Sequence, residues 1–160
     1  MPAATDIRIG AATPDDAPAV AALAVALTEE ISAVVGNRQF DLDIEATAAL
    51  CRALLDEGRY TVLLARAGDA CVGFAGLSEG RALYAGGAVG TIEELYVVPG
   101  WRSRGAGTAL LDAVARHGRA HGWRRTEVCT PPLPAFDRSL AFYERHGFAV
   151  TGGRKLKRLA

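Results

Sequence analysis

The chain of 160 residues has few aromatic side chains and no excess of charge of either sign. Aromatic residues make up only 7% although half of the residues are hydrophobic, so we expect one domain over residues 1–160 with a core of Ala, Leu and Val. Lys and Arg together number 18, as do Asp and Glu, and the formal net charge is zero. A nucleic-acid-binding protein usually has a basic excess, so we expect no nucleic-acid partner.

Cysteines are also scarce, and no targeting segment is evident. Cys51, Cys71 and Cys129 are widely spaced among apolar residues. Their odd number argues against a disulfide framework, and no pair has metal-ligand spacing. We therefore expect reduced cysteines in the core of a cytoplasmic protein. The N-terminus lacks a signal-peptide pattern, and the Ala-rich run over 17–27 is too short to span a bilayer, which predicts no membrane partner.

The hydrophobic pattern predicts a mixed α/β chain around one sheet. Helix starts and ends are marked by cap residues, above all Thr13-Pro14 before the first helix and Gly36 after it. Residues 80–90 are rich in Gly and Ala and are expected to form a loop or an irregular strand edge. We expect helices over 14–36, 44–56, 107–121 and 139–145, and strands over 7–11, 60–66, 71–77, 91–98, 126–129 and, as a closing pair, 148–159.

The most informative stretch is residues 95–111, LYVVPGWRSRGAGTALL. It predicts a strand, a sharp turn, a basic glycine-containing loop and a helix. The first N–H groups of a helix lack partners within the helix and lie at its positive dipole end, which suits a pyrophosphate. Gly105 and Gly107 would allow close approach of the backbone, and Arg102 and Arg104 add charge. For the glycines alone, a merely structural turn is the alternative.

The wider pattern resembles a known superfamily. Arg-x-x-Gly-x-Gly at 102–107, preceded by Leu-x-Val-x-Pro and followed by Thr-Ala-Leu-Leu, resembles the acetyl-CoA-binding motif of the GNAT N-acetyltransferases. Residues 140–148, LAFYERHGF, resemble the C-terminal signature of the same superfamily. The likeness is strong over 92–148. A dinucleotide-binding fold would need Gly-x-Gly-x-x-Gly and repeated βαβ units, and this chain has neither.

The resemblance implies a fold and a co-substrate. The GNAT fold has a mixed, mostly antiparallel sheet of about six to seven strands flanked by about four helices, and a bulge splays the sheet at the cofactor cleft. The co-substrate would be acetyl-CoA, with no metal. Its pantetheine arm would pair with backbone groups of Leu95, Tyr96 and Val97. Its pyrophosphate would lie on Arg102, Ser103, Arg104, Gly105, Ala106, Gly107 and Thr108.

The resemblance also implies catalytic roles. Tyr143 would protonate the leaving thiolate as a general acid. A base is needed because a protonated amine has no lone pair, and Glu93, Glu94 and Glu127 are the candidates. Strand alternation sends Glu93 and Glu94 to opposite faces, so at most one faces the cleft directly. Glu94 is preferred and Glu127 comes second, while a surface or ion-paired acid is the alternative for each.

Other residues limit the mechanism. Many relatives carry an asparagine before the tyrosine helix, and residues 129–137 contain none, so Thr130 or Ser139 would have to replace it. His117 and His121 are four residues apart without a third ligand, which favours solvated helix histidines over a metal site. No serine has a nucleophile-elbow context. We therefore expect direct transfer in a ternary complex, without an acyl-enzyme.

The acceptor is the least defined part of this interpretation. In the superfamily it lies between the first two helices, the strand-loop region and the C-terminal strands. Four acidic residues around the first two helices would attract a cationic amine or would form a solvated face: Glu29, Glu30, Asp41 and Asp43. Tyr84 and Phe40 would supply an apolar wall. We expect a small amine-bearing acceptor; a protein N-terminus or lysine, and a non-catalytic acyl-CoA sensor, are the alternatives. Homodimers are common in the superfamily, but no feature here demands one.

Overall fold

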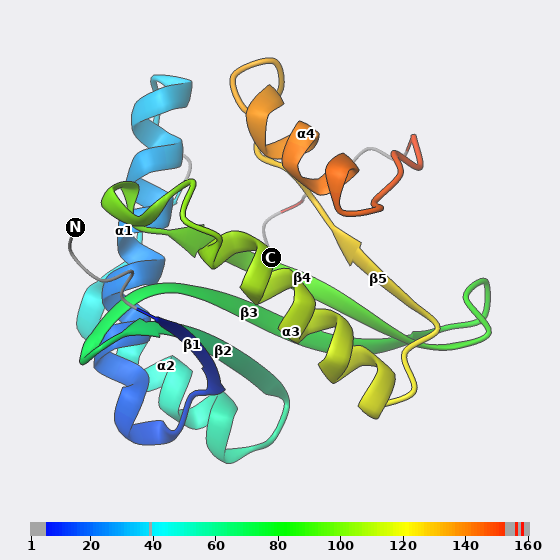
Figure 1. The fold of residues 1–160 in the computed structure, drawn as a ribbon, viewed down its shortest axis with the longest axis horizontal. Coiled ribbons are helices and arrows are strands. Elements are labelled where there is room, and N and C mark those ends of the chain that lie inside the picture. Colours follow the sequence, from blue (N-terminus) through cyan, green and yellow to red (C-terminus); the bar gives the residue numbers. More distant parts are fainter. Residues whose placement is uncertain (1–5, 39, 153–155, 157, 159–160) are drawn as a thin grey trace. The chain divides into compact units, whose positions relative to one another are not determined.

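The structure is a computed structural model that describes residues 6–38, 40–152, 156 and 158. The chain falls into two compact units, Met1–Val128 and Cys129–Ala160, called here the N-terminal and the C-terminal unit. The elements, labelled in Figure 1, are β1 (Ile7–Ala11), η1 (Pro14–Asp16), α1 (Ala17–Val35), α2 (Ile44–Asp56), β2 (Tyr60–Ala67), β3 (Ala70–Ala82), β4 (Gly87–Val97), η2 (Pro99–Trp101), α3 (Ala106–Ala120), β5 (Arg125–Val128) and α4 (Asp137–Arg145).

One sheet forms the centre of the N-terminal unit, with the strand order β1-β2-β3-β4-β5. The first four strands are antiparallel, and β5 runs parallel to β4. A parallel neighbour needs a crossover, and α3 supplies it. This is the predicted mixed α/β fold with four α-helices, although five strands are present in the described residues instead of six to seven. Of the closing pair expected over 148–159, residues 148–152, 156 and 158 are not in strands, and the others lie outside the described residues.

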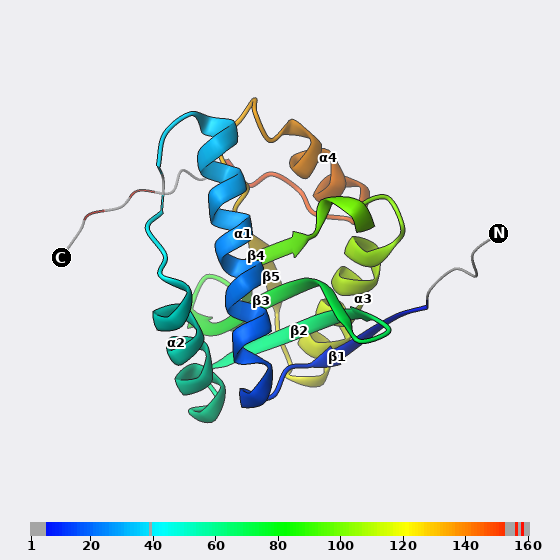
Figure 2. The same ribbon diagram turned by 90° about the vertical axis from the view of Figure 1, so that its left-hand side faces the viewer.

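Helices cover both faces of this sheet (Figure 2). Helices α1 and α2 lie on one face, and α3 lies on the other, against β1 to β4. Because both faces are covered, β2 and β3 carry apolar residues at consecutive positions instead of alternating ones. On the α1–α2 face the buried cluster consists of Ala17, Val20, Leu23, Ala24, Cys51, Val62, Leu64, Phe74 and Tyr96.

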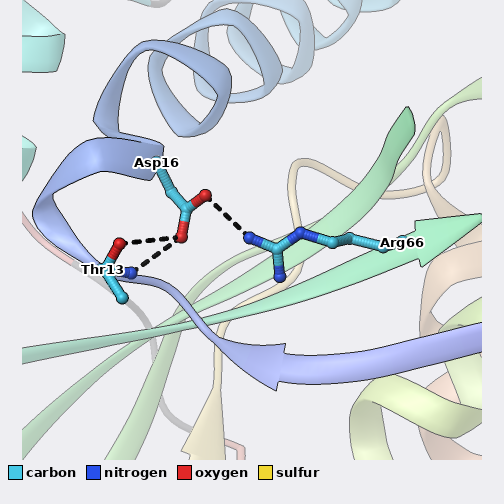
Figure 3. A network of polar contacts seen from close by, with 3 residues as sticks. All are labelled: Thr13, Asp16 and Arg66. Atoms are coloured by element: carbon cyan, nitrogen blue, oxygen red, sulfur yellow. Dashed lines mark hydrogen bonds and ion pairs between the residues drawn. The ribbon is translucent and has the colours of Figure 1, made fainter. Parts of the chain in front are cut away.

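The start of α1 is fixed to the sheet by a small polar network (Figure 3). The Asp16 carboxylate accepts a hydrogen bond from the Thr13 N–H at 2.8 Å and one from the Arg66 guanidinium at 2.7 Å. These two contacts outweigh burial and lower the pKa of Asp16, the Thr13 bond being the larger cause. The predicted helix start at Thr13-Pro14 is confirmed, as a 3-10 turn that leads into α1.

Helix α1 is longer than the Ala-rich run suggested. The helical stretch Pro14–Val35 has the length and the mean hydropathy, 1.6, of a membrane-spanning helix. Six residues of α1 are buried within the fold, among them Val20 and Leu23 at the centre of the core cluster. Length therefore does not exclude a membrane span, contrary to the expectation from the Ala-rich run, and α1 contributes its six buried residues to the core of the fold.

Two other expectations need correction. Residues 80–90 are not one continuous loop, and of the two expected alternatives the strand is nearer: β3 runs to Ala82 and β4 begins at Gly87, with a turn over 83–86 between them. Glycine and alanine have a low strand propensity, and the pairing of the two strands overrides it here. The three cysteines are free, but only Cys51 is in the core, because Cys71 is half-buried and Cys129 is exposed.

Candidate active site

Strand β4 changes its surroundings halfway along its length. Its first half pairs with β3 on one side and with β5 on the other, but the β5 pairing ends at Ile92. Opposite β3 the register shifts, since Gly76 faces Glu94 and Leu77 faces Ile92, so that Glu93 is an extra, bulged residue. Within the described strands, 93–97 therefore pair with β3 alone. This is the bulge and the splayed edge that the resemblance implies.

The free edge carries the backbone predicted to bind the pantetheine arm. Unpaired N–H and C=O groups on a sheet edge can pair with an extended ligand as an added strand would. Leu95 and Val97 are half-buried and Tyr96 is buried. The Val97 carbonyl already accepts a hydrogen bond from Arg102 Nε at 2.8 Å, so this oxygen is occupied. The edge fits an extended arm that pairs chiefly beside Leu95 and Tyr96.

The loop after β4 turns sharply into α3. Ser103 has φ of 59° and is the one non-glycine residue with a positive φ in the described part of the chain. Gly105, the N-cap of α3, has φ of 86°, and a Cβ added there would meet nothing within 4 Å. The backbone thus turns around open space at the positive end of a 15-residue helix. Such a junction fits the phosphates of acetyl-CoA, as predicted for residues 102–108.

The Arg102 side chain has a different environment from the one predicted. Its Nη1 and Nη2 atoms donate to the two carboxylate oxygens of Glu30 in α1, at 2.8 and 2.6 Å. Its guanidinium also lies 5.5 Å from the centre of the Tyr96 ring. The hydrogen bonds that Arg102 donates to Glu30 raise the pKa of Arg102. The side chain therefore braces the loop against α1 and β4, and pyrophosphate binding would fall to backbone groups and to Arg104, which stacks over Trp101 at 4.9 Å.

Glu94 is the carboxylate with the most distinctive surroundings. It is half-buried, and its Oε2 accepts a hydrogen bond from the hydroxyl of Tyr60 in β2. Burial raises the pKa of Glu94, the Tyr60 hydrogen bond opposes that rise, and the charge of Glu93 adds to it. A carboxylate with a raised pKa is a better proton acceptor than an exposed one, so Glu94 suits the role of a general base.

The other two candidate bases, Glu93 and Glu127, accept contacts from neighbouring side chains nearer the surface. Glu93 is exposed and accepts a hydrogen bond from the Ser78 hydroxyl at 2.5 Å. Glu127 accepts one from the Tyr84 hydroxyl and forms an ion pair with Arg125, both at 3.0 Å. Glu93 and Glu94 differ in exposure, but they do not point to opposite faces as strand alternation predicted. Their partners on β3, Ser78 and Gly76, are two residues apart and share a face, because the bulge at Glu93 interrupts the alternation. Glu127 has the ion-paired surroundings that were weighed as its alternative.

Most of the acidic residues expected to attract an amine have partners within the chain. Glu30 holds Arg102, Asp41 forms an ion pair with Arg38 at 2.8 Å, and Asp43 caps α2 through the Ala46 N–H. These contacts account for three of the four acids as structural groups. The two predicted aromatic wall residues are solvent-accessible, with exposed fractions of 47% for Phe40 and 73% for Tyr84.

The C-terminal unit carries Tyr143 on α4. Its side chain is buried, and its ring makes edge contacts with the rings of Phe142 and Phe148 at 5.5 and 5.4 Å. Burial raises the pKa of Tyr143 to about 12. The hydroxyl therefore holds its proton at neutral pH and is able to donate it. Its role as the general acid stays a prediction.

The histidines belong to a separate cavity. His117 and His121 stack at 3.9 Å and line a cavity of about 580 Å³ at the C-terminal end of α3, the opposite end from Gly105. Burial, and then the neighbouring His121, lower the pKa of His117. Trp123 also lines the cavity, and its indole N–H donates to Glu79 at 2.6 Å. No group of three or more His, Cys, Asp or Glu side chains in the described ranges could hold a metal ion.

Two site residues, Tyr60 and Gly76, were not predicted from the sequence, and Glu30 was predicted for the acceptor and not as the partner of Arg102. Tyr60 is 34 residues from Glu94, and Glu30 is 72 residues from Arg102. No local motif predicts such pairs, because strand register and helix packing bring their residues together.

Comparison with known proteins agrees with this geometry. The sequence model of the acetyltransferase (GNAT) family matches residues 25–148. No curated protein sequence matches the chain.

Several solved structures share the fold. An integron cassette protein from the mobile metagenome of Cole Harbour Salt Marsh is 25% identical, with a TM-score of 0.78, over 94% of this chain and 89% of that one. An aminoglycoside N-acetyltransferase in complex with CoA is 22% identical, with a TM-score of 0.80, over 99% and 98% of the two chains. A ribosomal-protein-alanine N-acetyltransferase from Brucella melitensis biovar Abortus is 21% identical, with a TM-score of 0.73, over 97% and 100%.

Proposed function

The chain belongs to the acetyltransferase (GNAT) family, and from this premise we propose that it acetylates a primary amine of a small molecule by direct transfer from acetyl-CoA. The observation that carries the proposal is Glu94, a half-buried carboxylate with a raised pKa, placed where β4 loses its second neighbour. The edge for the pantetheine arm and the base for the amine thus lie on the same five-residue segment, 93–97.

Acetyl-CoA, when bound, supplies a thioester whose acyl carbon exchanges its bond to sulfur for a bond to the amine nitrogen. Backbone groups beside Leu95 and Tyr96 would hold the pantetheine arm, and the turn at Gly105 would hold the pyrophosphate. Glu94 takes the proton that the ammonium must lose before its nitrogen can react. Tyr143 gives a proton to the leaving sulfur. No covalent enzyme intermediate is required, since no serine in the sequence has a nucleophile-elbow context.

The names of several similar solved structures support a small-molecule acceptor. Among them are aminoglycoside acetyltransferases from soil metagenomic samples, one in complex with sisomicin, at TM-scores of 0.70 to 0.75. The similar ribosomal-protein-alanine N-acetyltransferase supports a protein amine as the competing class of acceptor.

The test is release of CoA thiol from acetyl-CoA in the presence of a panel of amines. The panel holds sisomicin, spermidine, free lysine and a hexapeptide with N-terminal alanine, each at the same concentration. We expect kcat/KM for at least one small amine to exceed that for the peptide by tenfold or more. Preference for the peptide would move the protein to the protein-acetylating class. Saturable acetyl-CoA binding with no thiol release from any amine would support a non-catalytic sensor.

The Tyr143→Phe variant separates an enzyme from a sensor. It removes only a hydroxyl, so acetyl-CoA affinity should persist, while turnover should fall by about 10²- to 10⁴-fold if Tyr143 is the acid. Undiminished turnover would remove Tyr143 from the mechanism.

A further inference from the structure

The Glu94 carboxylate is held by a residue from another strand. Tyr60 begins β2, and its hydroxyl donates a hydrogen bond to Glu94 Oε2 on β4, across the intervening strand β3. The ring of Tyr60 packs against the buried cluster on the α1–α2 face. Since a tyrosine ring has only two side-chain torsions, a packed ring fixes the position of its hydroxyl.

Gly76 of β3 makes the contact across a strand possible. It lies opposite Glu94 in the β3–β4 register, between Tyr60 and Glu94. A Cβ at Gly76 would overlap both Glu94 Oε2 and the Tyr60 hydroxyl oxygen. Any other residue would therefore have to displace one of the two hydrogen-bonded groups. Three neighbouring strands each contribute one residue to a single contact.

From this geometry we propose that Tyr60 is the positioning residue of the catalytic base: its hydroxyl holds one carboxylate oxygen of Glu94, in space that Gly76 leaves free, and directs the other oxygen to the amine. The proposal rests on the proposed function, because it takes Glu94 as the base. Tyr60 acts through Glu94 and need not touch either substrate.

The pKa values of Tyr60 and Glu94 support a hydrogen bond in which the Tyr60 hydroxyl is the donor and the Glu94 carboxylate the acceptor. Burial, and then the charge of Glu94, raise the pKa of Tyr60 well above its ordinary value, so the phenol keeps its proton and serves as a donor. A hydrogen bond to the charged form of a carboxylate favours that form. Tyr60 therefore offsets part of the effect of burial and keeps Glu94 able to accept a proton.

The other titratable groups near Glu94 come from α2 and from β4 itself. The Cys51 thiol of α2 has a raised pKa, from burial and in part from the charge of Glu94, and stays neutral at working pH. Glu93 is a like charge that raises the pKa of Glu94. Neither group lowers the pKa of Glu94, so among these neighbours Tyr60 alone favours the charged carboxylate.

The experiment measures Glu94 protonation directly in the full chain. The infrared carboxylic C=O band of the wild type minus that of Glu94→Gln is followed against pH, and the titration is repeated in a Tyr60→Phe background. Loss of the hydrogen bond should move the Glu94 midpoint to higher pH. In the thiol-release assay, the acid limb of kcat/KM should move in the same direction, with kcat/KM about tenfold lower on that limb and KM for acetyl-CoA unchanged.

Tyr84→Phe is the matched control, because it removes the same kind of hydrogen bond from the competing carboxylate Glu127. It should leave the Glu94 midpoint in place. Gly76→Ala supplies a second variant: it should move the midpoint as Tyr60→Phe does, and the double variant should add little to either change.

The outcomes separate the two claims. An unmoved Glu94 midpoint in folded Tyr60→Phe would overturn the positioning role, even if Glu94→Gln abolishes turnover. A moved midpoint together with active Glu94→Gln would show that Tyr60 holds a carboxylate that is not the base, and the base assignment would fail. If the acid limb of kcat/KM moves in Tyr84→Phe and not in Tyr60→Phe, the catalytic base would be Glu127.

Discussion

The two ends of β4 show how one strand combines a structural and a chemical role. Near its first end, over 89–92, it has a strand neighbour on each side, and Gly90 lies against the Trp123 indole so closely that a Cβ would overlap the ring. At its second end, over 93–97, it has one strand neighbour, a bulge and a half-buried carboxylate. Paired backbone gives rigidity, and unpaired backbone leaves groups for a ligand. The chemistry therefore lies at the point where pairing stops.

The largest expected effect on the ligand-binding end of β4 is that of Gly105→Glu. The loop that follows the second end would gain a carboxylate where a pyrophosphate is expected, so we expect acetyl-CoA affinity to fall at least ~100-fold, or 2.7 kcal/mol. Calorimetric titration measures the loss. Gly68→Glu is the control: its φ of 60° imposes a similar backbone strain, its surroundings are equally open, and it lies in the β2–β3 turn. Equal affinity of the two variants would contradict the placement of the phosphates.

Gly90→Ala should have the opposite signature at the paired end. A methyl group would push against the Trp123 ring, and overpacking of this kind costs about 1–3 kcal/mol of unfolding free energy. Acetyl-CoA affinity of the folded protein should stay as in the wild type. Urea unfolding gives the free energy, and Gly80→Ala serves as the control because a Cβ there meets nothing within 4 Å. If Gly90→Ala lowered acetyl-CoA affinity without lowering the unfolding free energy, the paired end of β4 would not have the purely structural role proposed here.

Glu30→Gln should have the smallest effect, because it weakens a brace and leaves the site residues in place. The Arg102–Glu30 pair is bidentate but partly exposed, with side-chain exposures of 43% and 33%, so its loss should cost up to about 1 kcal/mol. We expect acetyl-CoA affinity to fall by about two- to fivefold, with kcat nearly unchanged. Glu29→Gln, the exposed neighbour on α1, is the control. A larger loss of kcat than of affinity would assign Glu30 to the acceptor instead.

Much of the fold was predictable because its helix ends are local. The Thr13 to Asp16 start, the stop at Gly36 and the α2 bounds 44–56 depend on caps and on helical spacing within a few residues. The strands over 80–90 were not predictable, since Gly and Ala have weak strand propensity and the pairing of β3 with β4 decides their structure.

The site divides in the same way. The motif over 102–107 marks the loop and the start of α3, but it does not show that Arg102 turns toward Glu30. Alternation predicted opposite faces for Glu93 and Glu94, but the bulge at Glu93, a property of β3–β4 pairing, interrupts that alternation. Tyr60 and Gly76 join Glu94 only through the register of three strands, so no single stretch of sequence reveals them.

The most direct test compares turnover of Glu94→Gln and Glu127→Gln, which make the same change at the two ranked bases. Glutamine retains an oxygen that can accept the Tyr60 hydrogen bond, so folding should be preserved, and removal of a half-buried charge should leave the melting temperature equal or higher. We predict that kcat falls about 10²- to 10⁴-fold in Glu94→Gln and less than about threefold in Glu127→Gln. Near-normal turnover in folded Glu94→Gln would contradict the account and remove the base from the open end of β4.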